Sequence, residues 1–271
     1  GVVACRIIDS PRERLIATLT NNFVPCNGRF PTLIALSMIL IGTSVHSPFA
    51  AFLTSGIVII IVLSGVAVTF IVSFILSKTL LKGAPSTFNL ELPPYRKPQI
   101  GKVIIRSIFD RTLFVLGRAI AIALPAGAIT WLVANIMIGN TSILNHISDF
   151  LDPFGRAIGL DGIILLAFIL ELPANEIVLP IVFMSYLSKG AMIELNGIEE
   201  MRNIFVSNGW TWLTCLNVML FSLFHFPCGT TLWTIKKETQ SLKWTIAAFI
   251  IPTLVAILVC FSTTRIAHWF H

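Results

Sequence analysis

Residues 223–231 read Leu-Phe-His-Phe-Pro-Cys-Gly-Thr-Thr and interrupt an otherwise apolar stretch of the chain. A second Pro-Cys pair lies near the other end, in residues 23–29, Phe-Val-Pro-Cys-Asn-Gly-Arg. Proline removes a backbone donor and bends a helix, and lipid tolerates the freed backbone groups only where protein or water covers them. Two such breaks, each with a thiol, predict a two-part polar site inside a membrane for a ligand that binds sulfur.

The composition predicts an integral membrane protein. The apolar fraction is 55%, the charged fraction is 12%, and the mean hydropathy is +0.87, whereas soluble domains carry about 25% charged residues. Because a bilayer needs about 20 apolar residues per helical span, the stretches free of Asp, Glu, Lys and Arg predict at least five spans. These stretches are residues 30–77, 119–148, 203–235 and 244–264.

The net charge of +6 does not point to nucleic acid, because the basic residues flank apolar runs as the positive-inside rule predicts. The five cysteines show no disulfide-type spacing. No cleavable signal peptide is visible at the amino terminus. Gly1 is not typical of a native start, so we expect a piece of a longer protein.

The first half of the chain predicts a broken span followed by a continuous one. Residues 15–24 form a half-helix that stops at Pro25, and the second half-helix covers 30–45. After a turn at His46-Ser47-Pro48, residues 49–77 form a long span.

The basic stretch 78–118 belongs in the cytoplasm by charge. It holds an extended Pro-rich linker and then an interfacial amphipathic helix that begins near Gln99. A span at 118–138 follows, and the acidic residues of 139–161 place that loop outside.

The segment 162–188 is apolar but is interrupted by Glu171-Leu-Pro-Ala-Asn-Glu176. Because 189–209 also looks external by charge, 162–188 predicts a re-entrant hairpin with its tip at Pro173-Ala174-Asn175. A second broken span covers 210–235, and Lys236, Lys237 and Lys243 return the chain to the cytoplasm. The last span, 244–264, leads outside.

The two broken spans therefore cross in opposite directions, which predicts an inverted repeat with a site near the midplane. The predicted fold is an all-α polytopic bundle with broken helices, a re-entrant hairpin and two inverted repeats. We expect residues 1–14 to be the returning arm of an incomplete hairpin in the first repeat. The predicted divisions are 1–78 (first repeat), 79–117 (linker and interfacial helix), 118–158 (connecting span and loop) and 159–271 (second repeat).

Five side chains are candidate metal ligands. The thiols of Cys26 and Cys228 suit transition metals, although a free Cys is more often a small buried apolar residue. Asn175 and Glu176 follow the hairpin break, where an acid is expensive in a membrane and marks a cavity or a cation, or else caps a helix. His225 has ligand-like spacing to Cys228, but a hydrogen-bonded or interfacial histidine is the alternative that we favour.

Other polar residues near the breaks are expected to have structural roles rather than to bind a metal. Arg29 is expected to snorkel or to cap carbonyls freed by a break, and Glu171 ranks below Glu176 because an interfacial position is open to it. Cys5, Cys215 and Cys260 are expected to be packing residues. The sequence holds no P-loop, no His-Glu-x-x-His, no Cys-x-x-Cys and no nucleophile elbow, so nothing in it indicates an enzyme.

Several segments, in this order, resemble the membrane domain of ferrous iron transport protein B, FeoB. They are residues 12–17, 25–29, the linker 83–93, the tip 172–176 and the break 226–228. The resemblance covers essentially the whole chain. It implies the membrane part of a bacterial inner-membrane importer of Fe²⁺, built from two gate repeats that move relative to one another.

The resemblance also implies parts that this sequence does not show. They are an amino-terminal G domain that binds GTP with Mg²⁺, a first membrane helix, and a third Cys at the first hairpin tip. It implies Cys26, Cys228, Asn175 and Glu176 as equivalent site positions and Fe²⁺ as the cargo. The expected partners are the lipid bilayer, the G domain and a small FeoA-type protein, with a homo-oligomer left open and no nucleic acid.

Two other readings remain open from the sequence. A gate-type transporter of an organic solute, such as a nucleoside, would share the hairpin and the broken helices but would use amides and helix ends rather than thiols. A membrane assembly module that transports nothing would share the fold but not depend on the cysteines or Glu176.

Overall fold

The computed structural model describes residues 1–41, 48–83, 99–106, 109, 113–139, 141–187 and 197–269. The His46-Ser47 turn and most of the Pro-rich linker therefore lie outside the described residues. The first half contains η1 Val2–Ile7, α1 Pro11–Thr20, η2 Asn21–Phe23, α2 Phe30–Ile41, α3 Pro48–Lys78, α4 Ile100–Arg106 and α5 Phe114–Asn135. The second half contains β1 Met137–Ile138, β2 Thr141–Ser142, α6 Ile143–Ala157, α7 Gly162–Leu170, α8 Val178–Tyr186, α9 Ile198–Ser207, α10 Trp212–Phe224, α11 Gly229–Thr239 and α12 Leu242–Trp269.

The first broken span forms as the sequence predicts. Ser10 caps α1 by accepting a hydrogen bond from the Glu13 backbone N–H, and Pro11 occupies the first turn, where no backbone donor is needed. The helical path ends at η2, and Pro25 and the following residues separate it from α2. The long helix α3 covers the predicted second span.

Within the described residues, three helical segments are long and apolar enough to cross a membrane: Ala50–Lys78, Trp212–Thr239 and Leu242–Trp269. The bent pair α6 and α7 adds a fourth if it is counted as one span. At least five spans were expected from the apolar stretches. The difference arises because α2, with 12 residues, is only part of a broken span, and the apolar part of α5 is also short.

The segment 162–188 is a helical hairpin, as predicted. Its arms α7 and α8 have nine residues each, or about 13 Å of helix, which is roughly half of a bilayer. The two arms pack on each other, and their open ends meet because the Tyr186 hydroxyl donates to the Asp161 carboxylate. Trp210 Nε1 donates to the same hydroxyl at 2.7 Å, which ties the start of the second broken span to the hairpin.

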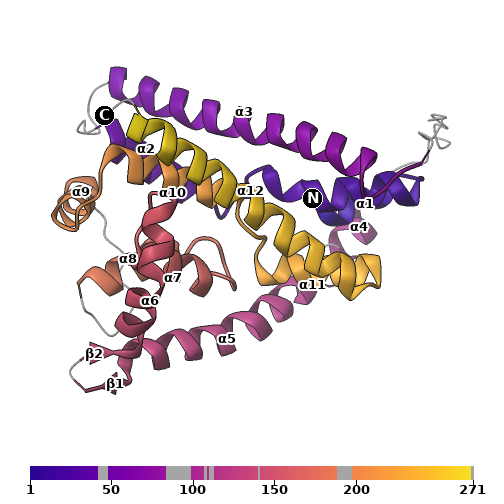
Figure 1. The fold of residues 1–271 in the computed structure, drawn as a ribbon. Helices are drawn as coiled ribbons and strands as arrows, with labels where there is room; N and C mark the ends of the chain where they lie inside the picture. Colours follow the sequence, from indigo (N-terminus) through magenta and orange to yellow (C-terminus); the bar gives the residue numbers. More distant parts are fainter. Residues whose placement is uncertain are drawn as a thin grey trace.

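The two halves repeat one packing pattern. The long helix α3 contacts α1, α2 and α10, and the long helix α12 contacts α10, α11 and α1. Figure 1 shows α3 and α12 crossing the molecule in opposite directions. Each long helix therefore contacts the broken span of its own half and one helix of the other half, as two inverted repeats require. This arrangement confirms the predicted fold class.

The amino-terminal residues pack against the second half of the chain. η1 packs against α11, just as α9 packs against α2, so η1 takes the place of α9 in the first repeat. α9 follows the hairpin and is not one of its arms. The interpretation of residues 1–14 as a returning hairpin arm stays a prediction, and the observed contacts compare η1 with α9 rather than with a hairpin arm.

The segment 139–161, expected to be an external loop, is mostly helical. β1 and β2 pair Met137 with Ser142 and Ile138 with Thr141, and α6 follows at once. α6 meets α7 at an angle of 108°. A Cβ on Gly162 would lie 2.0 Å from the Ser148 carbonyl oxygen, so this close crossing depends on glycine.

Candidate functional site

The two Pro-Cys breaks and the hairpin tip meet in the folded chain. The Asn175 side-chain amide lies 3.8 Å from Cys26 Sγ. The Leu172 carbonyl, at the start of the tip, accepts a hydrogen bond of 2.7 Å from the backbone N–H of Gly229, which follows Cys228. Three segments far apart in the sequence therefore supply one polar region among apolar helices.

Arg29 joins the two breaks. Its side chain is only 1% exposed, and its guanidinium donates to the carbonyls of Asn22 and Leu223 at 2.8 Å and of His225 at 3.2 Å. The sequence predicted that Arg29 would cap carbonyls freed by a break. The structure confirms this and adds that most of these carbonyls belong to the opposite break, in the second repeat.

Cys26 is exposed and lines a cavity of about 270 Å³. Thr230 and Thr231 line the same cavity, and both hydroxyls lie within 3.2 Å of Cys228 Sγ. Cys26 and the two threonines that contact Cys228 thus line one cavity. The remaining lining residues are Gly1, Val2, Val3, Asn21 and Thr234.

A surface ion pair fastens η1 to α11 beside this region. Arg6 binds Glu238 through two hydrogen bonds, of 2.7 Å and 2.6 Å. The hydrogen bond and the charge of Glu238 raise the pKa of the Arg6 guanidinium. This paired geometry holds together two segments whose residues, Val2 and Thr234 among them, line the cavity.

The hairpin tip presents two different polar groups. Asn175 is buried, and its Oδ1 atom has no hydrogen-bond partner among the described residues. Glu176 is exposed and lies against Gly28 so closely that a Cβ there would be 3.0 Å from Glu176 Cγ and 3.2 Å from Oε1. An unused amide oxygen and a nearby carboxylate are both suitable donors for a cation.

His225 is placed apart from the cavity. Its Nδ1 atom lies 2.9 Å from the Phe221 carbonyl oxygen and 3.0 Å from that of Ser222, and its Nε2 atom contacts the Glu171 carboxylate. Both side chains are fully buried. This geometry favours the buried, hydrogen-bonded histidine over the ligand that the spacing to Cys228 suggested.

Glu171 is a polar residue whose partner the sequence does not identify. It is completely buried, and it contacts His225. The sequence holds a signal for this pairing, because an acid inside a membrane needs a partner. His225 lies in the other interrupted apolar segment and is a candidate for that partner. The pairing itself depends on tertiary contacts that no local pattern encodes.

The described residues contain no group of three or more His, Cys, Asp and Glu side chains placed to hold one metal ion. The structure instead gathers Cys26 with Asn175, Glu176 with Gly28, and Cys228 with two threonines. Chemically, these are soft sulfur and hard oxygen donors around a small polar cavity. These donors could bind a metal ion, although they are not arranged as a single metal site.

The fold and the site define a class: a multi-pass helical membrane protein with broken helices that meet a hairpin tip. Comparison with known families agrees. A family model described as ferrous iron transport protein B C terminus matches residues 58–110, and a Gate model described as nucleoside recognition matches residues 116–242.

Individual relatives extend these matches over the whole chain. The Fe(2+) transporter FeoB of Staphylococcus aureus is 28% identical over 281 residues, covering 100% of this chain and 39% of the relative. The FeoB proteins of Leptospira biflexa and Methanocaldococcus jannaschii are 26% and 24% identical, each over 96% of this chain. No solved structure matches.

These matches confirm the resemblance drawn from the sequence: the chain is similar to a membrane portion of the relatives named FeoB. It spans about 39% of the length of the relatives named FeoB from Staphylococcus aureus.

Proposed function

We propose that this chain is the membrane part of an importer that moves Fe²⁺ across the bacterial inner membrane. The observation that carries the proposal is the convergence of the two Pro-Cys breaks on the hairpin tip, where Asn175 lies 3.8 Å from the Cys26 thiol. The relatives' printed names point to Fe²⁺ as the cargo.

The proposed ligand set follows from donor chemistry. Cys26 and Cys228 supply sulfur, Asn175 supplies an amide oxygen with no other partner, and Glu176 supplies a carboxylate beside the first break. Fe²⁺ accepts mixed sulfur and oxygen ligands. In the structure these donors do not form a single closed shell, which suits a cargo that must also be released.

The transport step would be a relative movement of the two repeats. Arg29 and the Leu172–Gly229 hydrogen bond connect the breaks and the tip, so a shift of one repeat changes the distance between the thiols. In the full-length protein this movement would be coupled to a GTP-binding domain with its Mg²⁺. A FeoA-type partner and a homo-oligomer belong to the same proposal.

The test is radiolabelled Fe²⁺ uptake by the full-length protein in which Cys26→Ser and Cys228→Ser are combined. Loss of a direct ligand should lower uptake by at least about ten-fold, since even indirect partners of metal ligands are worth 10–100-fold in affinity. Cys5→Ser is the matched control, because Cys5 does not line the cavity. Undiminished uptake by the double variant would overturn the metal-thiol proposal.

An organic solute is the second candidate, favoured by the match of residues 116–242 to a model described as nucleoside recognition. Uptake of a radiolabelled nucleoside that persists in the double Cys variant would select it. If growth under low iron also survives Glu176→Ala and the Cys changes, and no solute moves, a non-transporting assembly role replaces both.

A further inference from the structure

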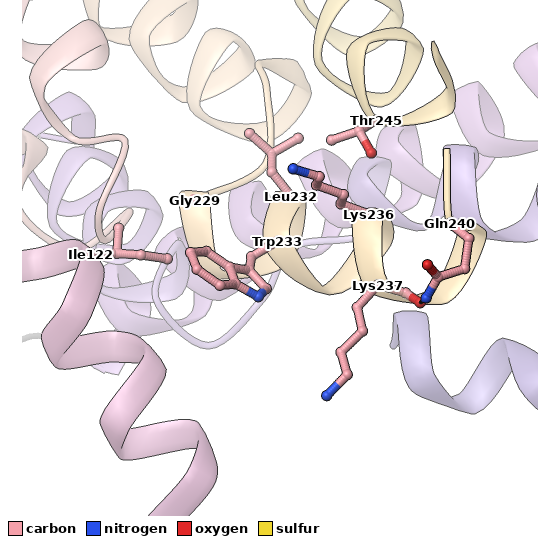
Figure 2. Close-up of a pocket in the computed structure, with 8 residues that line it drawn as sticks. All are labelled: Ile122, Gly229, Leu232, Trp233, Lys236, Lys237, Gln240 and Thr245. Carbon is pink, nitrogen blue, oxygen red and sulfur yellow. Dashed lines mark hydrogen bonds between the residues drawn. The ribbon is translucent and has the colours of Figure 1, made fainter. Parts of the chain in front are cut away.

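A second, larger cavity of about 540 Å³ lies on the side of α11 away from the thiols of the candidate site. Figure 2 shows its lining, which α5 and the start of α12 complete. The residues are Ile122, Gly229, Leu232, Trp233, Lys236, Lys237, Gln240 and Thr245. None of the uses proposed above involves this cavity.

The cavity is lined by both apolar and cationic side chains. Ile122 of α5 faces the Trp233 ring, and Leu232 lies beside them (Figure 2). Lys236 and Lys237 follow one turn further along α11, and Gln240 lies just past its end. In Figure 2 the Lys236 amino group lies toward Leu232 and Thr245 of α12, whereas the Lys237 side chain extends the opposite way. A ligand with one apolar part and one anionic part matches this lining.

The two lysines are not neutralised within the part of the chain that the structure describes. No Asp or Glu lines the cavity, and no ion pair joins either lysine to a described acid. The nearest acid on α11, Glu238, is bound to Arg6 instead. The site therefore carries two positive charges that an anionic ligand would compensate.

The location suits a lipid. Trp233 is 54% exposed, and exposed tryptophans with neighbouring lysines are typical of the membrane–water interface. The charge pattern places this end of α11 on the cytoplasmic side, where anionic lipids lie and where basic pockets between helices bind anionic head groups. The volume falls within the range of about 300–1,000 Å³ that small-molecule sites occupy.

We propose that this cavity binds the phosphate-bearing head group of an anionic phospholipid, with an acyl chain lying along Ile122, Leu232 and Trp233. A free phosphate would share the lysine contacts but would leave the apolar side chains unused. Because Gly229 both lines the cavity and follows Cys228, a bound lipid would hold α11 beside the second break. This inference does not depend on the nature of the cargo.

The test uses quenching of Trp233 fluorescence by lipids with brominated acyl chains. The full-length protein is placed in vesicles of brominated phosphatidylglycerol or brominated phosphatidylcholine, and the signal of Trp233 is obtained by subtracting that of the Trp233→Phe variant. Since each lysine near the surface contributes about a five-fold preference for anionic lipid, we expect phosphatidylglycerol to quench Trp233 at a several-fold lower fraction in the bilayer.

The combined change Lys236→Gln and Lys237→Gln should bring the two lipids to parity. Lys243→Gln is the matched control, because Lys243 is a nearby basic residue that does not line the cavity, and it should leave the preference intact. Equal quenching by both lipids in the unaltered protein, or an equal loss in the Lys243 control, would overturn the proposal. So would inorganic phosphate that removes the preference when chloride of equal ionic strength does not, since the site would then be one for free phosphate.

Discussion

The two Pro-Cys breaks carry the same residue pair, yet the fold treats them differently. The first break is open, with Cys26 and Asn27 exposed, whereas in the second break residues 221–227 are all buried and Cys228 is half-buried. The second break is also held by polar groups from elsewhere: Arg29 from the first repeat and Glu171 from the hairpin. A repeated motif thus yields one accessible side and one anchored side.

The two breaks are suited to different roles. The exposed first break can meet an ion or change its position at little cost. The second break cannot move without disturbing buried hydrogen bonds, which are expensive to leave unmade. Arg29 links the two, because it belongs to the open break but makes its contacts in the anchored one.

The largest predicted effect comes from Arg29→Ala. This change leaves the buried carbonyls of Leu223 and Phe226 without their donor and removes one of the two donors to the His225 carbonyl. We expect a loss of about 3–5 kcal/mol in unfolding free energy, measured by denaturant titration of the full-length protein in detergent. Arg12→Ala, another arginine bonded to backbone carbonyls but outside the breaks, is the control. Comparable losses in both variants would remove the special role of Arg29.

The Glu171–His225 pair should show coupling. Glu171→Leu or His225→Leu alone leaves one buried polar partner and should cost about 2–4 kcal/mol each, whereas the double change should cost clearly less than their sum. A double-mutant cycle in the same denaturant titration measures this. Glu176→Leu, at the exposed acid of the tip, should be close to neutral. Strict additivity of the two single changes would show that the pair does not interact.

The rate at which each thiol reacts should distinguish the exposed first break from the second break. Variants that keep one Cys each should react with a water-soluble maleimide in the order Cys26, then Cys228, then the buried Cys215 and Cys260. We expect Cys26 to react at least about ten-fold faster than Cys260, corresponding to about 1.4 kcal/mol in barrier. A faster reaction at Cys228 than at Cys26 would reverse the assignment of the open side.

The smallest predicted effect is that of Gly28→Ala. The added Cβ would lie 3.0 Å from Glu176 Cγ, but this exposed side chain can shift. The unfolding free energy should change by less than about 1 kcal/mol, while Fe²⁺ uptake falls because the carboxylate is displaced. Gly56→Ala, where a Cβ meets nothing within 4 Å, should leave both quantities unchanged. A drop in stability without a change in uptake would argue against a role for Glu176.

Much of the fold could be predicted from local chemistry. Proline placed both breaks, apolar length gave α3 and α12, and the interruption at Pro173 gave the α7–α8 hairpin. The sequence prediction does not contain α6, because the charged residues of this segment are typical of a loop, although Leu144, Ile147 and Leu151 recur at helical spacing on its packed side. Charge counts alone do not distinguish an amphipathic helix from a loop.

The candidate site was predicted only in part. Cys26 and Asn175 lie together and His225 contacts Glu171, and the ligand role of all the candidate residues stays a prediction. Ligand spacing along a chain is a weak guide where a proline sits between the residues, because the break sets the direction of each side chain.

By itself the sequence determined where helices stop, which stretches are apolar enough to enter a membrane, and which residues carry soft and charged donors. These features follow from proline's lack of a backbone N–H donor, from side-chain hydrophobicity and from ligand chemistry, all of which are local properties. Only the tertiary structure decided that Arg29 spans the two breaks, that Glu171 belongs to His225, and that one break is open while the other is buried. Such choices depend on which segments approach each other when buried polar groups must find partners, and that is settled by packing rather than by position in the chain.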